Sequence, residues 1–160
     1  MDNNDILIRL RYALDIKDTD MVEIFKLGGV EITKEEVLKL LEKEESDRAK
    51  CNYFMLESFL NGFIIFKRGA RETDSDQPIK PVLLIKNNNN VNNIVLKKLK
   101  IALAYSSENM IEIFDLTDVS ITNGELSALF RKEGHRNYRE CGDRYLRNFL
   151  KGLAIKYRNI

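Results

Sequence analysis

Several side chains that can do chemistry lie close together near the end of the sequence. His135, Tyr138, Cys141 and Asp143 occur within one short segment, with Asn137 among them. We expect this segment to be a loop that leads into a helix. Unpaired backbone amides stabilise a thiolate at the amino end of a helix, and a nearby imidazole could activate it. The segment therefore allows a cysteine-dependent enzyme.

The same residues also have a structural interpretation. Cys141 could be a small, half-buried residue that packs where the helix begins. Asp143 could be a first-turn acid favoured by the helix dipole, and His135 or Asn137 a turn or capping residue. The sequence has one histidine and contains no zinc ligand set, glycine-rich phosphate loop, Walker motif or GxSxG. We therefore expect no catalytic, metal-binding or cofactor-binding residue, and the role of this loop cluster stays open.

An internal duplication indicates which elements position these residues. Residues 4–41 align with a segment that begins at Asn93, at a shift of roughly 89 positions. After a one-residue insertion, the alignment resumes with Cys51 over Cys141. Matching pairs there include Leu56 with Leu146, Phe59 with Phe149, Gly62 with Gly152 and Ile65 with Ile155. Because Cys51 has no histidine around it, the duplication favours the structural interpretation of Cys141.

Each copy is predicted to form four helices, because its apolar residues recur at spacings of three and four. The second helix ends at Gly28 and Gly29 in the first copy, where glycine can adopt the left-handed conformation. Thr33 with Glu36, and Thr122 with Glu125, predict capping boxes at the start of the third helix. The fold class is therefore all-α, a tandem duplication of a four-helix unit packed as one pseudo-two-fold domain.

The predicted domains are a first helical repeat at residues 1–68, a linker at 69–91 and a second helical repeat at 92–160. Both prolines, Pro78 and Pro81, lie in the linker together with the asparagine run at 87–90. Within it, residues 82–85 are apolar enough to pack as an extended segment across one of the bundles.

Composition excludes several classes of protein. The chain has 160 residues, is 44% hydrophobic, and carries a net charge of +1, which excludes a polycationic protein and an acidic disordered one. No stretch approaches the roughly 18 apolar residues of a membrane span, and the acidic start is unlike a signal peptide. Two widely separated cysteines fit a reducing compartment. We expect a cytoplasmic protein that needs no membrane.

A resemblance to a known family covers nearly the whole chain apart from the linker. The residues that carry it are Glu125–Lys132, His135–Arg139, Cys141–Asp143, Leu146–Leu150 with Gly152, and the opening Asn93–Leu99. These residues resemble the signature of the YehS-like family, small bacterial proteins with two copies of a domain of unknown function. The resemblance implies the two-copy architecture, and it supplies no catalytic residue or cofactor to carry over.

One possible function is DNA binding, because residues 21–41 have the outline of a helix-turn-helix. A recognition helix that faces phosphates should be basic. Residues 33–45 instead contain five glutamates against three lysines. An ordinary helical corner is the better interpretation.

A basic stripe in the second copy gives the preferred hypothesis. Residues 1–91 hold 14 basic and 17 acidic side chains, and the rest of the chain holds 12 and 8. On the last helix Arg144, Arg147 and Lys151 share one face, where the first copy has Phe54, Glu57 and Asn61. The alternative is a solvated or internally ion-paired face. An aromatic at position 54 suggests a buried contact between the copies or in a homodimer.

These observations favour a non-catalytic binding, adaptor or regulatory protein that uses a basic face of the second repeat. The candidate partner-binding residues are Arg136, Tyr138, Arg139, Arg144, Arg147 and Lys151. A nucleic-acid partner is the alternative, with Tyr138 and Tyr145 as stacking groups for RNA or single strands. A cysteine-dependent enzyme is the third and least favoured reading. The sequence does not decide between a protein and a nucleic acid, and a homodimer is possible.

Overall fold

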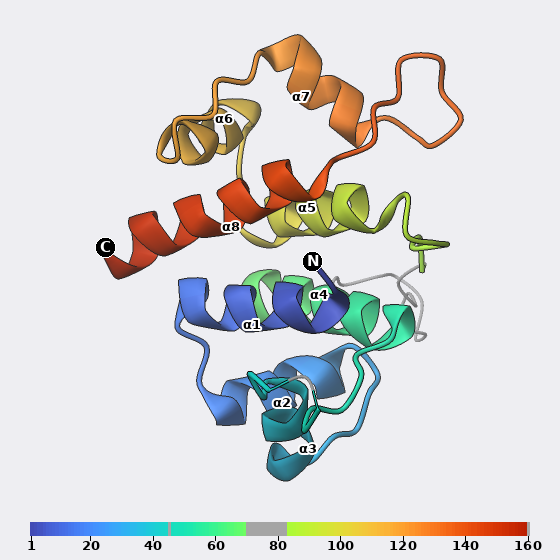
Figure 1. Cartoon of the computed structure of the whole chain (residues 1–160), viewed down its shortest axis with the longest axis vertical. Helices are drawn as coiled ribbons and strands as arrows, with labels where there is room; N and C mark the ends of the chain where they lie inside the picture. The colour runs from blue at the N-terminus through green and yellow to red at the C-terminus, as the bar shows by residue number, and fades with distance from the viewer. Residues whose placement is uncertain (45, 70–82, 160) are drawn as a thin grey trace.

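The structure, a computed structural model, describes residues 1–44, 46–69 and 83–159, and these residues form eight α-helices without a strand (Figure 1). The first repeat contains α1 (Asn3–Leu14), α2 (Asp18–Leu27), α3 (Lys34–Leu40) and α4 (Tyr53–Arg68). The second contains α5 (Val91–Ala102), α6 (Ser107–Asp115), α7 (Asn123–Phe130) and α8 (Asp143–Arg158). The prediction of an all-α fold built from two four-helix units is confirmed.

Local capping chemistry sets most helix starts. In α3 the Glu36 amide donates to Thr33 Oγ1 at 3.1 Å and the Thr33 amide donates to Glu36 Oε1 at 3.2 Å. Thr122 and Glu125 form the equivalent capping box at α7. Helix α2 differs, because Lys17 precedes it and makes no side-chain capping bond. Both predicted capping boxes are confirmed. They could be predicted because their bonds join residues only three positions apart.

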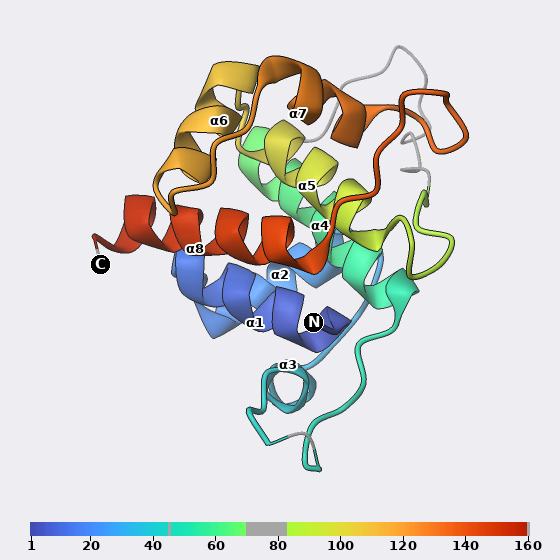
Figure 2. The ribbon, with the colours of Figure 1, turned by 45° about the horizontal axis from the view of Figure 1, so that its top comes forward.

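The two repeats pack as one body around four central helices. Helix α1 lies against α8 and α4 lies against α5, so each central pair joins one repeat to the other (Figures 1 and 2). Helices α2 and α3 cover one end of this centre, and α6 and α7 cover the other (Figure 1). Buried apolar side chains from both repeats form one continuous core. The predicted pseudo-two-fold packing is confirmed.

In each repeat, a glycine on the last helix allows that helix to cross the second helix in backbone contact. A Cβ atom at Gly62 of α4 would lie 1.8 Å from the carbonyl oxygen of Ile24 in α2. A Cβ at Gly152 of α8 would lie 2.4 Å from the carbonyl oxygen of Ile113 in α6. Real Cβ atoms do not approach backbone oxygen this closely, so these two positions require glycine.

In each repeat, a buried asparagine on the first helix forms hydrogen bonds with the end of the third helix and with the loop that precedes the last helix. Asn4 Nδ2 donates to the carbonyl oxygens of Leu40 and Ala49 at 2.9 and 2.8 Å, and its Oδ1 accepts from the Cys51 amide at 2.9 Å. Asn93 repeats the arrangement with Leu129, Arg139 and Cys141. These bonds fix both cysteines at the amino ends of α4 and α8.

The predicted linker is described in part. Residues 70–82, with Pro78, Pro81 and Val82, lie outside the described residues. Leu84 and Ile85 are half-buried, and their amides donate to the Glu57 carboxylate of α4 at 2.5 and 2.7 Å. The prediction that this apolar segment packs across the helices is therefore confirmed for these two residues.

Candidate functional site

The predicted stripe lies on the surface of α8. Arg144, Arg147 and Lys151 are all exposed. None of them forms an ion pair with another residue that the structure describes. Arg9 of α1, the helix packed against α8, is also exposed. The face is therefore open to solvent and carries positive charge without a paired carboxylate.

The equivalent face of the first repeat is covered. Glu57 and Asn61 of α4 are 1% and 5% exposed. Lys98 of α5 reaches both of them, with its Nζ 2.9 Å from Glu57 Oε2 and bonded to the side-chain oxygen of Asn61. The amides of Leu84 and Ile85 complete the shell around the Glu57 carboxylate. Burial of a charge requires such partners, so this polar cluster belongs to the packing of the two repeats.

Phe54 does not make the contact that its aromatic ring suggested. Its side chain is 54% exposed on α4. The predicted burial between the copies is wrong, because position 54 lies on the outer side of the helix and the neighbouring repeat covers Glu57 and Asn61. Burial in a homodimer stays a prediction.

The loop between α7 and α8 holds the remaining predicted binding residues in different environments. Arg136 is exposed. Arg139 has a guanidinium nitrogen 3.7 Å from Glu125 Oε2, and it lies over the Tyr145 ring at 5.6 Å from the centroid. The Arg139 side chain is 52% exposed, so this ion pair is a weak surface contact and the guanidinium stays open to solvent.

The predicted stacking tyrosines are both half-buried. Tyr145 lies between Arg139 and Phe114, whose ring meets it edge-on at 6.2 Å. The Tyr138 hydroxyl oxygen is buried and has no hydrogen-bond partner in the part of the chain described. Tyr12 and Tyr157 are the more exposed rings, at 49% and 45%.

The loop cluster divides into two separate groups of hydrogen-bonded residues. In the first, the Asn137 amide donates to His135 Nδ1 at 3.0 Å on the exposed loop. In the second, Cys141 and Asp143 both meet Asn92, which donates to the Cys141 carbonyl at 3.0 Å and to Asp143 Oδ1 at 2.8 Å. No hydrogen bond within the described ranges joins His135 to the Cys141 thiol.

The Cys141 thiol is poorly suited to nucleophilic chemistry. It is 2% exposed, and burial, with Asp143 acting in the same direction, raises its pKa to about 12. Cys51 has the same burial and the same raised pKa of about 12 without a histidine beside it. Nucleophilic cysteines need the thiolate form near neutral pH, and here both groups are thiols. The matching environments support the structural interpretation of both residues.

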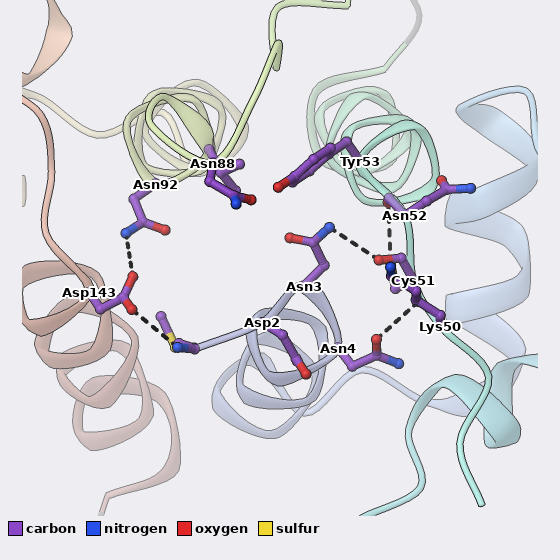
Figure 3. A pocket seen from close by; sticks show the side chains of 12 residues that line it. Asp2, Asn3, Asn4, Lys50, Cys51, Asn52, Tyr53, Asn88, Asn92 and Asp143 are labelled. Atoms are coloured by element: carbon purple, nitrogen blue, oxygen red, sulfur yellow. Dashed lines mark hydrogen bonds and ion pairs between the residues drawn. The ribbon is translucent and has the colours of Figure 1, made fainter. Parts of the chain in front are cut away.

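Asp143 belongs to a polar pocket on the pseudo-two-fold axis. The amino ends of α1, α4, α5 and α8 meet around this pocket, whose volume is about 650 Å³ (Figure 3). The side chains of Asn3, Tyr53 and Asn88 point into it (Figure 3). A hydrogen bond from Asn92 lowers the pKa of Asp143, and the Met1 amino group lies 3.1 Å from its Oδ2. Most polar groups here therefore bond to each other and to the helix ends.

Sequence reasoning missed two structural sets, the buried Asn4 and Asn93 and the cluster of Glu57 with Lys98. The asparagines carried a signal, since each is a polar residue at an apolar position of a first helix and the two align in the duplication. The charged pair carried none, because Glu57 and Lys98 lie on different repeats and each alone resembles a surface residue of an amphipathic helix.

Neither a membrane-spanning helix nor a metal-binding cluster occurs in the residues that the structure describes. No helix among them is both long and apolar enough to cross a membrane. No group of three or more histidine, cysteine, aspartate or glutamate side chains in residues 1–44, 46–69 and 83–159 is placed to hold a metal ion.

The fold and its duplicated polar network define an all-helical protein of two repeated units. Residues 3–69 and 92–159 each match the model of the family described as "Protein of unknown function (DUF1456)", and the chain belongs to this family. It is 40% identical over 155 residues to "Uncharacterized protein YehS" of Escherichia coli (strain K12), an alignment that covers 96% of this chain and 95% of the relative. No solved structure matches. The resemblance to the YehS-like family is confirmed.

Proposed function

We propose that the chain is a bacterial binding or adaptor protein that acts without catalysis, and that its partner contacts the α8 face of Arg144, Arg147 and Lys151. The observation that carries this proposal is the contrast between equivalent faces of the two repeats. Glu57 and Asn61 are buried by the neighbouring repeat, whereas Arg147 and Lys151 in the equivalent positions are exposed. Unpaired cations on one face attract a partner of opposite charge.

An acidic protein surface is the preferred partner. The two predicted stacking groups, Tyr138 and Tyr145, are half-buried and leave little free ring for base stacking. Protein interfaces use arginine readily, because its guanidinium bonds carboxylates in a bidentate geometry. We also propose the cytoplasm as the location, since both cysteines are free thiols. The domain boundaries at 68/69 and 91/92 stay a prediction.

A nucleic-acid partner is the second candidate. Arg158, which forms an ion pair with Asp15 at 2.7 Å, lies over the exposed Tyr12 ring at 4.6 Å, at the end of the same α8 face. Basic residues beside an exposed aromatic ring are the elements of a single-strand binding surface. This candidate predicts binding that weakens steeply as salt concentration rises.

The test compares the native chain with two double variants that change the net charge by the same amount. Fluorescence anisotropy with single-stranded DNA, RNA and duplex DNA, and affinity capture of proteins from a bacterial lysate, are compared for the native chain and for Arg144→Glu with Arg147→Glu. Lys34→Glu with Lys39→Glu on α3 is the matched control, because both lysines are exposed on the first repeat.

The proposal requires a partner that the α8 variant loses by at least about tenfold and the α3 variant keeps. A partner retained equally by both variants would refute the role of α8. Nucleic-acid binding lost in the α8 variant would make the second candidate the correct one.

A further inference from the structure

A second pocket lies in the second repeat, away from the axis. It has a volume of about 300 Å³ and lies between α5, α7, the segment 84–90 and the loop that follows α7. Leu84, Ile94, Leu129 and Phe130 supply its apolar wall. This volume is at the small end of the range for ligand pockets, so it suits a molecule with a short apolar body.

Positive charge surrounds this apolar wall. Lys86, Lys97, Arg131 and Lys132 line the pocket, and Glu133 is the acidic residue among the lining side chains. All four cations are outside the ion pairs that the described chain forms. The pocket therefore has the charge to hold an anion.

An unsatisfied donor lies in the same wall. Tyr138 lines the pocket, and its buried hydroxyl lacks a hydrogen-bond partner within the described residues. Burial, with Glu133 and Glu140 acting in the same direction, raises the pKa of Tyr138, so the hydroxyl keeps its proton. A buried polar group without a partner costs free energy. Because the hydroxyl oxygen is closed to solvent, a ligand oxygen reaches it only when the Tyr138 side chain turns toward the pocket, and the new bond then removes that cost.

The first repeat fills the equivalent position with its own charges. Arg48 takes the place of Tyr138 in the duplication, and its side chain is 8% exposed. It forms ion pairs with Asp2 at 2.5 Å and with Asp5 at 3.5 Å. The second repeat has Val91 and Ile94 where these acids stand. The second repeat therefore has an apolar wall and an unpaired hydroxyl where the first repeat has ion pairs. This pocket is not a feature that the two repeats share.

We propose that this pocket binds a small organic anion, with an apolar body against Ile94 and Phe130 and a carboxylate or phosphate that accepts from Tyr138 and faces Lys97 and Lys132. The site does not include the α8 face. Refutation of the proposed function would therefore leave this proposal intact, and refutation of this proposal would leave the proposed function intact.

The experiment is a titration followed by two-dimensional amide NMR of the full chain. Benzoate and phenyl phosphate are the probes, which separate a carboxylate ligand from a phosphate ligand. Benzyl alcohol supplies the same apolar body without charge, and inorganic phosphate supplies charge without the body. The variants are Tyr138→Phe, Lys97→Ile, which installs the residue found at position 8, and Lys132→Ala. Lys43→Ala, at the equivalent position of the first repeat, is the matched control.

The proposal expects saturable shifts at the lining residues with at least one anionic probe, and affinity about tenfold lower for benzyl alcohol and for Tyr138→Phe. Lys97→Ile and Lys132→Ala should each weaken binding, while Lys43→Ala should not. Tyr138→Phe should not lower the melting temperature, because it removes an unpaired buried hydroxyl. Equal binding of benzyl alcohol, equal binding of inorganic phosphate, or no saturable shift with either probe would overturn the proposal.

Discussion

Substitution of Gly62 by alanine should destabilise the protein through a backbone clash between α4 and α2. The new Cβ would lie 1.8 Å from the Ile24 carbonyl oxygen, where ordinary contact needs roughly 3.4 Å, so the two helices must separate by more than an ångström. Alanine in a helix interior gains about 1 kcal/mol in propensity over glycine. Overpacking costs about 1–3 kcal/mol and more against rigid backbone. A clash of this size with backbone raises the cost to about 3–5 kcal/mol, so after the propensity gain we expect a net loss of about 2–4 kcal/mol.

The same substitution at two other glycines provides a graded series. At Gly152 the Cβ would lie 2.4 Å from the Ile113 carbonyl oxygen, a milder clash. At Gly124 in the first turn of α7 the nearest atom is Thr122 Oγ1 at 3.9 Å, so alanine there should be neutral or stabilising by a few tenths of a kcal/mol. The expected order of stability loss is Gly62→Ala, then Gly152→Ala, then Gly124→Ala.

Urea denaturation followed by circular dichroism at the helix band would measure the three free energies of unfolding. If Gly62→Ala and Gly124→Ala differed by less than about 0.5 kcal/mol, the close crossing of α2 and α4 would be refuted.

Three further predictions concern buried polar groups. Burial raises the pKa of the Cys51 and Cys141 thiols from 9.0 to about 12, so the folded chain retains protons that the unfolded chain releases. The resulting stability is complete well below pH 9 and is lost toward pH 12, so between pH 8 and 10 the free energy of unfolding should fall about 3 kcal/mol more than in a variant with both cysteines changed to alanine. Equal pH slopes in urea titrations would contradict this. Lys98→Met should cost about 3 kcal/mol by leaving the Glu57 carboxylate buried without its cation, and adding Glu57→Gln should recover part of the loss in a double-mutant cycle. Asn93→Ala should lower the melting temperature, because it removes three hydrogen bonds to buried backbone groups, and an unchanged melting temperature would show that water replaces them.

The sequence was informative where structure depends on neighbours along the chain. The Thr33 and Thr122 capping boxes could be predicted because their bonds form within one helical turn. The duplication could be predicted because aligned residues such as Gly62 and Gly152 meet the same crossing in each repeat. The positions that required glycine were visible in the alignment, although the contact that required it was not.

Contacts between the repeats could not be predicted in the same way. Glu57 and Phe54 are three positions apart on one helix, and the periodicity alone does not show that the other repeat covers the acid and leaves the ring in solvent. The sequence left open whether Arg147 and Lys151 face solvent or form internal ion pairs. Their contrast with the buried Glu57 and Asn61 depends on how α5 and the segment before it lie on α4. The pocket around Tyr138 was missed because tertiary packing creates it. The sequence does not show that this packing leaves the Tyr138 hydroxyl without a partner.

The pairing of α1 with α8 has a consequence for synthesis on the ribosome. The first helix to emerge packs against one made more than a hundred residues later, and translation of that stretch takes several seconds at typical bacterial rates. During this interval the side of α1 that packs against α8 lacks its permanent cover. The first repeat can form its contacts among α2, α3 and α4 early, but the native arrangement is completed only when residues 143–158 have left the exit tunnel. We therefore expect nascent chains that stop before α8 to be substrates for chaperones.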